Sequence, residues 1–208
     1  VESLLQIVQY DGQTLSKRID YDYDLISGNV NYVYYQKGEN DQLIHKYVYD
    51  ADNRITGVET STDGILWTSD VNYQYYAHGP LAQTQVGELN VETDNYTYTI
   101  QGWIKQMQGN AFSYVLGYNS TDYTSIGNAT VMSAPVANNR NLYNGNIATT
   151  SSLTPALGSN VLTQQYTYDQ LNRITGSKTA NSNNAYMTSY SYDPNGNILT
   201  LNRYDQNS

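Results

Sequence analysis

An eleven-residue stretch that occurs twice constrains the fold of this sequence more than any other feature. Residues 47–57 read Tyr-Val-Tyr-Asp-Ala-Asp-Asn-Arg-Ile-Thr-Gly, and residues 166–176 match them at eight of eleven positions. The two stretches lie 119 residues apart, and a shorter third copy begins at Tyr190, 24 residues after Tyr166. Recurrence at a spacing of about 20 to 50 residues is the signature of a repeat architecture. We therefore expect one supersecondary unit used several times.

The residue types of this unit predict a strand, a tight turn and a second strand. Tyrosine, isoleucine and valine flank the turn, and these residues favour paired strands. Weaker copies place the second tyrosine of the unit at positions 23, 75 and 98. The sequence therefore predicts an all-β fold of repetitive antiparallel β-hairpins that form a curved sheet.

Each position of the turn has a predicted structural role. The aspartate that follows the second tyrosine can accept hydrogen bonds from backbone amides of the turn. Asparagine and glycine alternate three positions later, and they most readily adopt a left-handed backbone. The predicted repeat-turn residues are Tyr47, Tyr49, Asp50, Asn53, Arg54, Tyr166, Tyr168, Asp169, Asn172, Arg173, Tyr192, Asp193 and Gly196.

The aromatic composition indicates a thin or hollow structure. The chain has 23 tyrosines but only 2 tryptophans and 1 phenylalanine. A buried tyrosine hydroxyl needs a hydrogen-bond partner, so a thick dry core would use phenylalanine and leucine instead. Tyrosine in this excess suits a sheet with two partly wet faces.

The repeats predict a single segment over residues 1–208. They are clear in about 19–104 and 164–203, and an irregular region with insertions separates them at 105–163. We expect two or three distorted units in that region, and a helix within 105–117 is an alternative. No secretory signal is visible and Val1 falls within the pattern, so we expect a piece of a longer protein.

Charge and composition exclude several classes of partner. The net charge is −9, which argues against binding to nucleic acid or to an anionic membrane surface. No stretch reaches the ~18 apolar residues of a transmembrane helix. The absence of cysteine removes disulfides, thiol nucleophiles and cysteine metal sites.

No arrangement of residues points to catalysis, a metal or a cofactor. Asp20, Asp22 and Asp24 alternate as on one face of a strand, and calcium binding is the alternative to a solvated strand edge. The aspartates of the repeats recur at one turn position, which favours turn formation over paired catalytic carboxylates. The two histidines, His45 and His78, lack metal-ligand spacing.

The repeated pattern Tyr-x-Tyr-Asp-x-x-Gly-Arg/Asn-Ile/Leu resembles the YD repeats of the RHS (rearrangement hotspot) and teneurin class. The clearest copies are residues 47–57, 166–176 and 190–199. The resemblance implies a β-ribbon that spirals into a hollow shell, carried on large secreted or cell-surface proteins. Such a shell encloses a variable C-terminal domain that is often toxic. The implied partners are further YD repeats and the C-terminal cargo domain of the same chain, with cell-surface or secretion-system proteins besides.

The chain departs from this family in one respect. The family's core region with an aspartyl self-cleavage site does not appear, although Asp193-Pro-Asn-Gly196 is similar to its Asp-Pro-x-Gly motif. This stretch is in register with the other turns, and we expect it to be one of them. The leading hypothesis is a non-enzymatic shell segment that helps to enclose or present a C-terminal domain. The alternative is an adhesin or glycan-binding module that uses aromatics such as Trp67 and Trp103.

Overall fold

A computed structural model describes residues 2–123, 132–137, 140–180 and 186–205. The chain divides into two compact units, residues 1–93 and 94–208. The fold is all-β, as predicted: apart from short 3-10 segments, the regular elements of the described residues are antiparallel strands. In each unit the strands pair in chain order, so each strand lies beside the next one in the sequence. The expectation that residues 1–208 form one segment stays a prediction.

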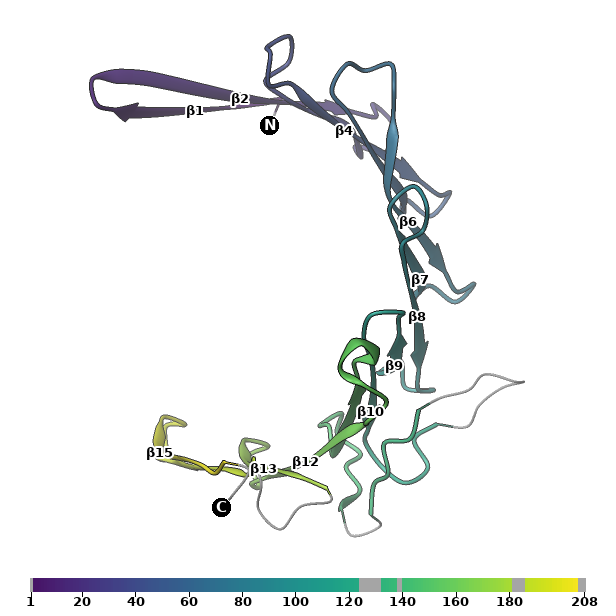
Figure 1. The fold of residues 1–208 in the computed structure, drawn as a ribbon, viewed down its shortest axis with the longest axis vertical. Helices are drawn as coiled ribbons and strands as arrows, with labels where there is room; N and C mark the ends of the chain where they lie inside the picture. The colour runs from purple at the N-terminus through teal and green to yellow at the C-terminus, as the bar shows by residue number, and fades with distance from the viewer. Residues whose placement is uncertain (1, 124–131, 138–139, 181–185, 206–208) are drawn as a thin grey trace. The chain divides into compact units, whose positions relative to one another are not determined.

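The first unit is an open sheet of hairpins. Figure 1 shows its β1–β2 hairpin in purple, extending from the more strongly twisted strands that follow. At the tip of this hairpin, Asp11 and Gly12 both have positive φ, of 48° and 74°, which suits a tight two-residue turn. The strands are β1 (Ser3–Tyr10), β2 (Gln13–Tyr23), β3 (Val30–Tyr35), β4 (Leu43–Tyr49), β5 (Ile55–Ser61), β6 (Thr68–Tyr75) and β7 (Leu81–Val86).

The second unit has the same organisation and contains the helix η2 (Pro155–Leu157). The predicted alternative of a helix within 105–117 is wrong. Two strands occupy that stretch, because the first pairs on both sides and a turn follows it at Gly109. The strands are β8 (Glu92–Tyr98), β9 (Ile104–Gln108), β10 (Ser113–Gly117), β11 (Thr149–Leu153), β12 (Leu162–Tyr168), β13 (Ile174–Thr179), β14 (Thr188–Tyr192) and β15 (Ile198–Arg203).

A β-bulge accompanies every recognised repeat turn. The register always shifts just before the second tyrosine of the unit, because a left-handed residue in the turn adds one residue to one strand. The shifted tyrosines are Tyr23, Tyr49, Tyr75, Tyr98, Tyr168 and Tyr192. A bulge increases local twist, so the repeat places extra twist at regular intervals.

Burial is sparse and is concentrated in the second unit. Among the described residues, Ile44 is the single buried apolar side chain of the first unit. Val115, Leu116, Tyr118 and Ala148 form the core of the second unit, on β10 and just before β11. Strands β1 and β15 are exposed along their whole length. The thin, wet sheet that the tyrosine excess predicts is therefore found everywhere except around β9–β11.

Candidate functional site: the repeat turn and its expanded copy

The aspartate of each clear repeat organises its turn through backbone amides. Asp50 accepts hydrogen bonds from two amides of its own turn, at 2.9 Å each, and Asp169 does the same. The amide of Arg54 is the main cause that lowers the pKa of Asp50 below its usual value. In Asp193 the side chain of Asn197 is the first cause of a lowered pKa, followed by its amide. Hydrogen bonds to the charged form favour ionisation, so these carboxylates act as turn-forming anions.

The fourth residue of the turn has the left-handed backbone that the alternation of asparagine and glycine predicts. The φ angles are 60° at Asn53, 62° at Asn172 and 90° at Gly196. The two asparagines have a further role, since each side chain accepts a hydrogen bond from an earlier turn. Asn29 donates to Asn53 at 3.0 Å, and Asn144 donates to Asn172 at 2.7 Å. Neighbouring turns of the sheet edge are therefore linked to each other.

The arginine of the turn extends this link to the following repeat. Arg54 pairs with the aspartate of its own turn at 2.8 Å, and its guanidinium lies 4.6 Å from the centre of the Tyr75 ring. It also donates to the carbonyl of Gly79 in the next turn, at 3.3 Å. Arg173 repeats the arrangement, with its guanidinium 4.7 Å from the centre of the Tyr192 ring. The arginine therefore connects its own turn to the next unit.

The second tyrosine of the unit makes the opposite link, which we call the tyrosine clamp. In five units its hydroxyl donates to the carbonyl of the aliphatic residue that follows the previous turn, at 2.6 to 2.9 Å. The clamps join Tyr49 to Val30, Tyr75 to Ile55, Tyr118 to Ile104, Tyr168 to Ile147 and Tyr192 to Ile174. The clamp satisfies the phenol hydroxyl that a thin sheet half-buries.

The clamps reveal a repeat that sequence comparison misses. Tyr118 donates to the preceding unit, and Ile147 accepts from the following one, so both belong to the same copy. The pairing of Gly117 with Thr149 places them in the register of an ordinary turn. However, residues 119–146 separate them, whereas five residues form the β4–β5 turn. In the described residues the irregular region therefore holds one expanded unit, and the expectation of two or three is wrong.

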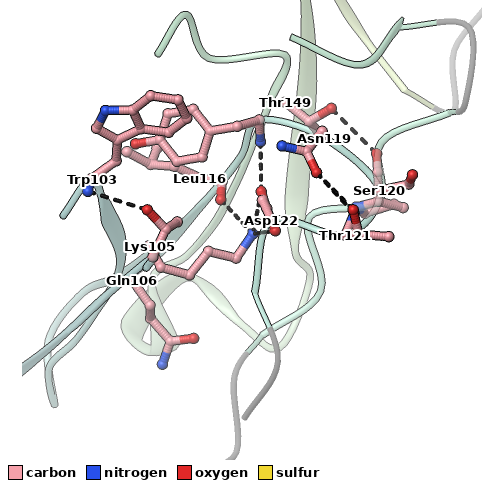
Figure 2. A network of polar contacts seen from close by, with 12 residues as sticks. Trp103, Lys105, Gln106, Leu116, Asn119, Ser120, Thr121, Asp122 and Thr149 are labelled. Carbon is pink, nitrogen blue, oxygen red and sulfur yellow. Dashed lines mark hydrogen bonds and ion pairs between the residues drawn. The ribbon is translucent and has the colours of Figure 1, made fainter. Parts of the chain in front are cut away.

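The expanded turn is fixed to the sheet by a buried ion pair (Figure 2). The ammonium of Lys105 on β9 lies 2.8 Å from a carboxylate oxygen of Asp122, and both side chains are 7% exposed. The ammonium also donates to the carbonyl of Leu116 at 2.7 Å. Asp122 in turn accepts the amide of Tyr118 at 2.7 Å. A buried ion pair is tolerated only when further hydrogen bonds satisfy both partners, and here they do.

An aromatic pair lies beside this ion pair. The rings of Trp103 and Tyr118 are 5.0 Å apart between centroids, and a β-carbon on Gly145 would lie 3.4 Å from the indole. Burial is the main cause that raises the pKa of Tyr118 to about 12. Tyr118 at the beginning of the expanded turn and Gly145 at its end therefore both lie against the indole of Trp103.

Described parts of the expanded turn also cover polar side chains of the sheet. The amide of Met132 donates to Gln106 at 2.8 Å, and Thr149 donates to the carbonyl of Pro135 at 3.2 Å. Gln106 and Thr149 are only 2% and 1% exposed. This cover explains how Gln106 and Thr149 are buried although they are polar: the turn supplies backbone partners for both. Residues 124–131 and 138–139 of this turn lie outside the described residues.

The remaining sequence candidates have local structural contacts. Asp20 pairs with Arg18, while Asp24 lies beyond the end of β2 and caps its own turn. His78 stacks on Tyr76, at 5.3 Å between ring centroids. Within the described part of the chain, three or more histidine, aspartate or glutamate residues nowhere gather as metal ligands.

Both tryptophans are half-buried against their neighbours. Trp67 lies 6.0 Å from the ring of Tyr32 and 5.5 Å from the ammonium of Lys46. Trp103 packs against Tyr118 in the expanded copy.

Asp193 and Gly196 form an ordinary repeat turn, in which the Gly196 amide donates to the Asp193 carbonyl at 3.1 Å. No candidate helix for crossing a membrane occurs among the residues that the structure describes.

Comparison with known proteins adds evidence at the level of the fold. No protein-family model and no curated protein matches the sequence. A crystal structure of TcdB2–TccC3–Cdc42 aligns with 98% of this chain, with a TM-score of 0.69 and 13% identity. A Tc holotoxin pore from Photorhabdus luminescens, with a mutation in TccC3, aligns with 98%, at a TM-score of 0.70 and 15% identity.

The fold is similar to that of Tc toxin chains. This chain spans 11% and 10% of the length of the two chains that it matches. At such low identity the likeness shows the fold, and the residues described above carry any further conclusion.

Proposed function

We propose that this chain is a structural, non-enzymatic segment of the wall of a larger β-shell protein. The observation that carries the proposal is the two-way linkage of the repeats. Arg54 and Arg173 each reach forward to the next unit, and the tyrosine clamp reaches back to the previous one. The polar groups that the sequence repeats are thus used to hold neighbouring units together.

The two exposed end strands support the same proposal. β1 has exposed Leu4, Leu5, Ile7 and Val8, and β15 has exposed Ile198, Leu199 and Leu201. An edge strand offers unpaired backbone groups, and exposed apolar side chains on it favour pairing with another strand. Further YD repeats of a longer chain are the partners that fit these edges.

The YD-repeat resemblance and the Tc-toxin-like fold together supply the cargo hypothesis. The wall encloses or presents a C-terminal domain of the same longer chain, and the protein is exported or displayed on the cell surface. The matched Tc structures come from toxin assemblies, which is consistent with this role.

Limited proteolysis of the intact protein tests enclosure. We expect the C-terminal domain to resist protease within the protein and to become sensitive when Tyr118, Tyr168 and Tyr192 are changed to phenylalanine. Equal digestion of the enclosed and the isolated domain would contradict the proposal. Self-cleavage of the chain that disappears in the Asp193→Asn variant would contradict the proposal that the segment is non-enzymatic.

Glycan binding stays an alternative hypothesis without support from the contacts of Trp67 and Trp103, which pack against the protein's own tyrosine rings. Binding on a glycan array that is lost in the Trp67→Ala variant would favour glycan binding over the structural role.

A further inference from the structure

A cavity of about 230 Å³ lies over strands β12, β13 and β14. Its lining includes Arg140 from the expanded turn, Gln165 and Thr167 on β12, Lys178 on β13 and Ser189 on β14. Both charged side chains in this lining are cationic, while most of the exposed lining surface is apolar. The cavity belongs entirely to the second unit.

Arg140 has an unsatisfied buried group at this cavity. Its Nη1 atom is shielded from solvent and has no hydrogen-bond partner within the described residues. A guanidinium is always charged, and a buried donor without a partner loses its hydration without compensation. An anion bound in the cavity that Arg140 lines would compensate its charge.

The first copy of the repeat shows what is different here. In that copy the cross-strand pair equivalent to Gln165 and Lys178 is Lys46 and Glu59, which form an ion pair at 2.8 Å. The second copy thus has Lys178 on β13 at the position where the first copy has Glu59 on β5. The internal acid that neutralises the first copy is missing from the second.

The floor of the cavity also differs between the copies. In the first copy Gly57 pairs with Asn72, whose side-chain oxygen would lie 3.4 Å from a β-carbon on the glycine. In the second copy Gly176 pairs with the shorter Ser189, which lines the cavity. Ser189 accepts a hydrogen bond from Asn202 at 3.3 Å, so its hydroxyl proton remains available for donation.

We propose that this cavity binds a carboxylate, presented by an aspartate or glutamate side chain of a polypeptide. Arg140 donates from its guanidinium, Lys178 adds a second positive charge, and Ser189 donates its hydroxyl. The volume is below the roughly 300 Å³ at which pockets for drug-sized ligands begin, and it suits a single side chain. The net charge of −9 repels polyanions such as nucleic acid, which favours a single carboxylate within a polypeptide.

A titration of the whole chain with a blocked glutamate, N-acetylglutamate N-methylamide, tests the site. We expect saturable NMR shifts on β12–β14 with this probe and none with the blocked glutamine. Arg140→Ala should weaken binding by about tenfold or more, the range for a hydrogen bond to a charged group. Arg203→Ala removes an exposed cation outside the cavity and should leave affinity unchanged.

A second variant tests shape without changing charge. Ser189→Asn introduces the residue type that covers the glycine in the first copy, and it should abolish binding while Arg140 remains. Far-UV circular dichroism shows that each variant is folded. Equal affinity for the glutamate and glutamine probes, or unchanged affinity in Arg140→Ala, would overturn the proposal. Tighter binding of inorganic phosphate than of blocked glutamate would overturn the choice of carboxylate.

Discussion

The turn between β4 and β5 and the turn between β10 and β11 are two solutions to the same connection. The first uses five residues, and the second uses residues 119–146. Both keep the same register and the same tyrosine clamp, through Tyr49 and Tyr118. The comparison teaches that the clamp and the strand pairing define the unit, while the length of the turn is free.

The two turns differ in what they do to the sheet below. The short turn leaves a thin layer, in which Ile44 is the one buried apolar side chain among the described residues of the first unit. The long turn folds back over β9–β11 and buries Lys105, Gln106 and Thr149. An insertion in a turn therefore adds a second layer locally, without changing the pattern of strands.

The largest expected effect is on the ion pair of the expanded turn. Asp122→Ala leaves the Lys105 ammonium buried without its carboxylate, at a cost of about 3–5 kcal/mol in the free energy of unfolding. Urea denaturation measures this value. Replacing both partners, in Lys105→Met with Asp122→Leu, should restore most of the loss. A small effect of Asp122→Ala alone would show that the expanded turn contributes little to stability.

A matched pair of glycine variants sharpens the same contrast. A β-carbon on Gly117 would lie 2.7 Å from the carbonyl of Ala134 in the expanded turn, too close for any real contact. Gly117→Ala should therefore cost about 1–3 kcal/mol, as overpacking does. The nearest atom to a β-carbon on Gly57 is 3.4 Å away, in a side chain, so Gly57→Ala should change stability by about 0.5 kcal/mol or less. Equal losses in thermal or urea unfolding would contradict the contrast.

Replacing one tyrosine with phenylalanine removes the clamp from each region, because phenylalanine lacks the hydroxyl group. Tyr118→Phe leaves the Ile104 carbonyl without its donor in a buried setting, at a cost of about 1–3 kcal/mol. Tyr49→Phe removes the same bond from a wetter sheet, where water replaces it, and should cost about 0.5–1.5 kcal/mol. Urea midpoints of the two variants give the comparison. A larger loss for Tyr49→Phe would reverse the proposed order.

The smallest effect is a dependence on pH that the two short turns with an aspartate and an arginine share. The folded pKa of Asp50 and Asp169 lies below the ordinary value, first because the amide of the turn arginine donates to each carboxylate. Their contribution to stability is therefore present above the ordinary aspartate pKa and is lost as pH falls through the folded pKa. The double variant Asp50→Asn with Asp169→Asn should show a flatter fall of unfolding free energy with acid. An unchanged acid profile would contradict this assignment.

The sequence predicts the parts of the structure that depend on local chemistry. The left-handed backbone of Asn53 and the amide contacts of Asp50 follow from which residues accept such a turn. The strands follow from alternating tyrosine and valine, as in β3. These features require no knowledge of distant contacts.

The features that the sequence did not reveal depend on partners far along the chain. The acceptor of the tyrosine clamp is a backbone carbonyl, which every residue has, so the sequence contains no mark of it. Lys105 and Asp122 are 17 residues apart and outside any repeated motif. Tyr118 escaped notice because Asn119, in place of aspartate, follows it. A tyrosine at a strand end with an Asn-Gly-Asn turn downstream, as at 144–146, was the available signal.

The tyrosine clamp has a consequence for how such a chain changes over time. The donor is encoded within one unit, but the acceptor in the preceding unit places no demand on its side chain. Duplication or deletion of whole units therefore requires no matching substitution in the neighbouring unit. The same property makes the turn between Tyr118 and Ile147 a natural place to graft a foreign loop, because both neighbours would still find their partners.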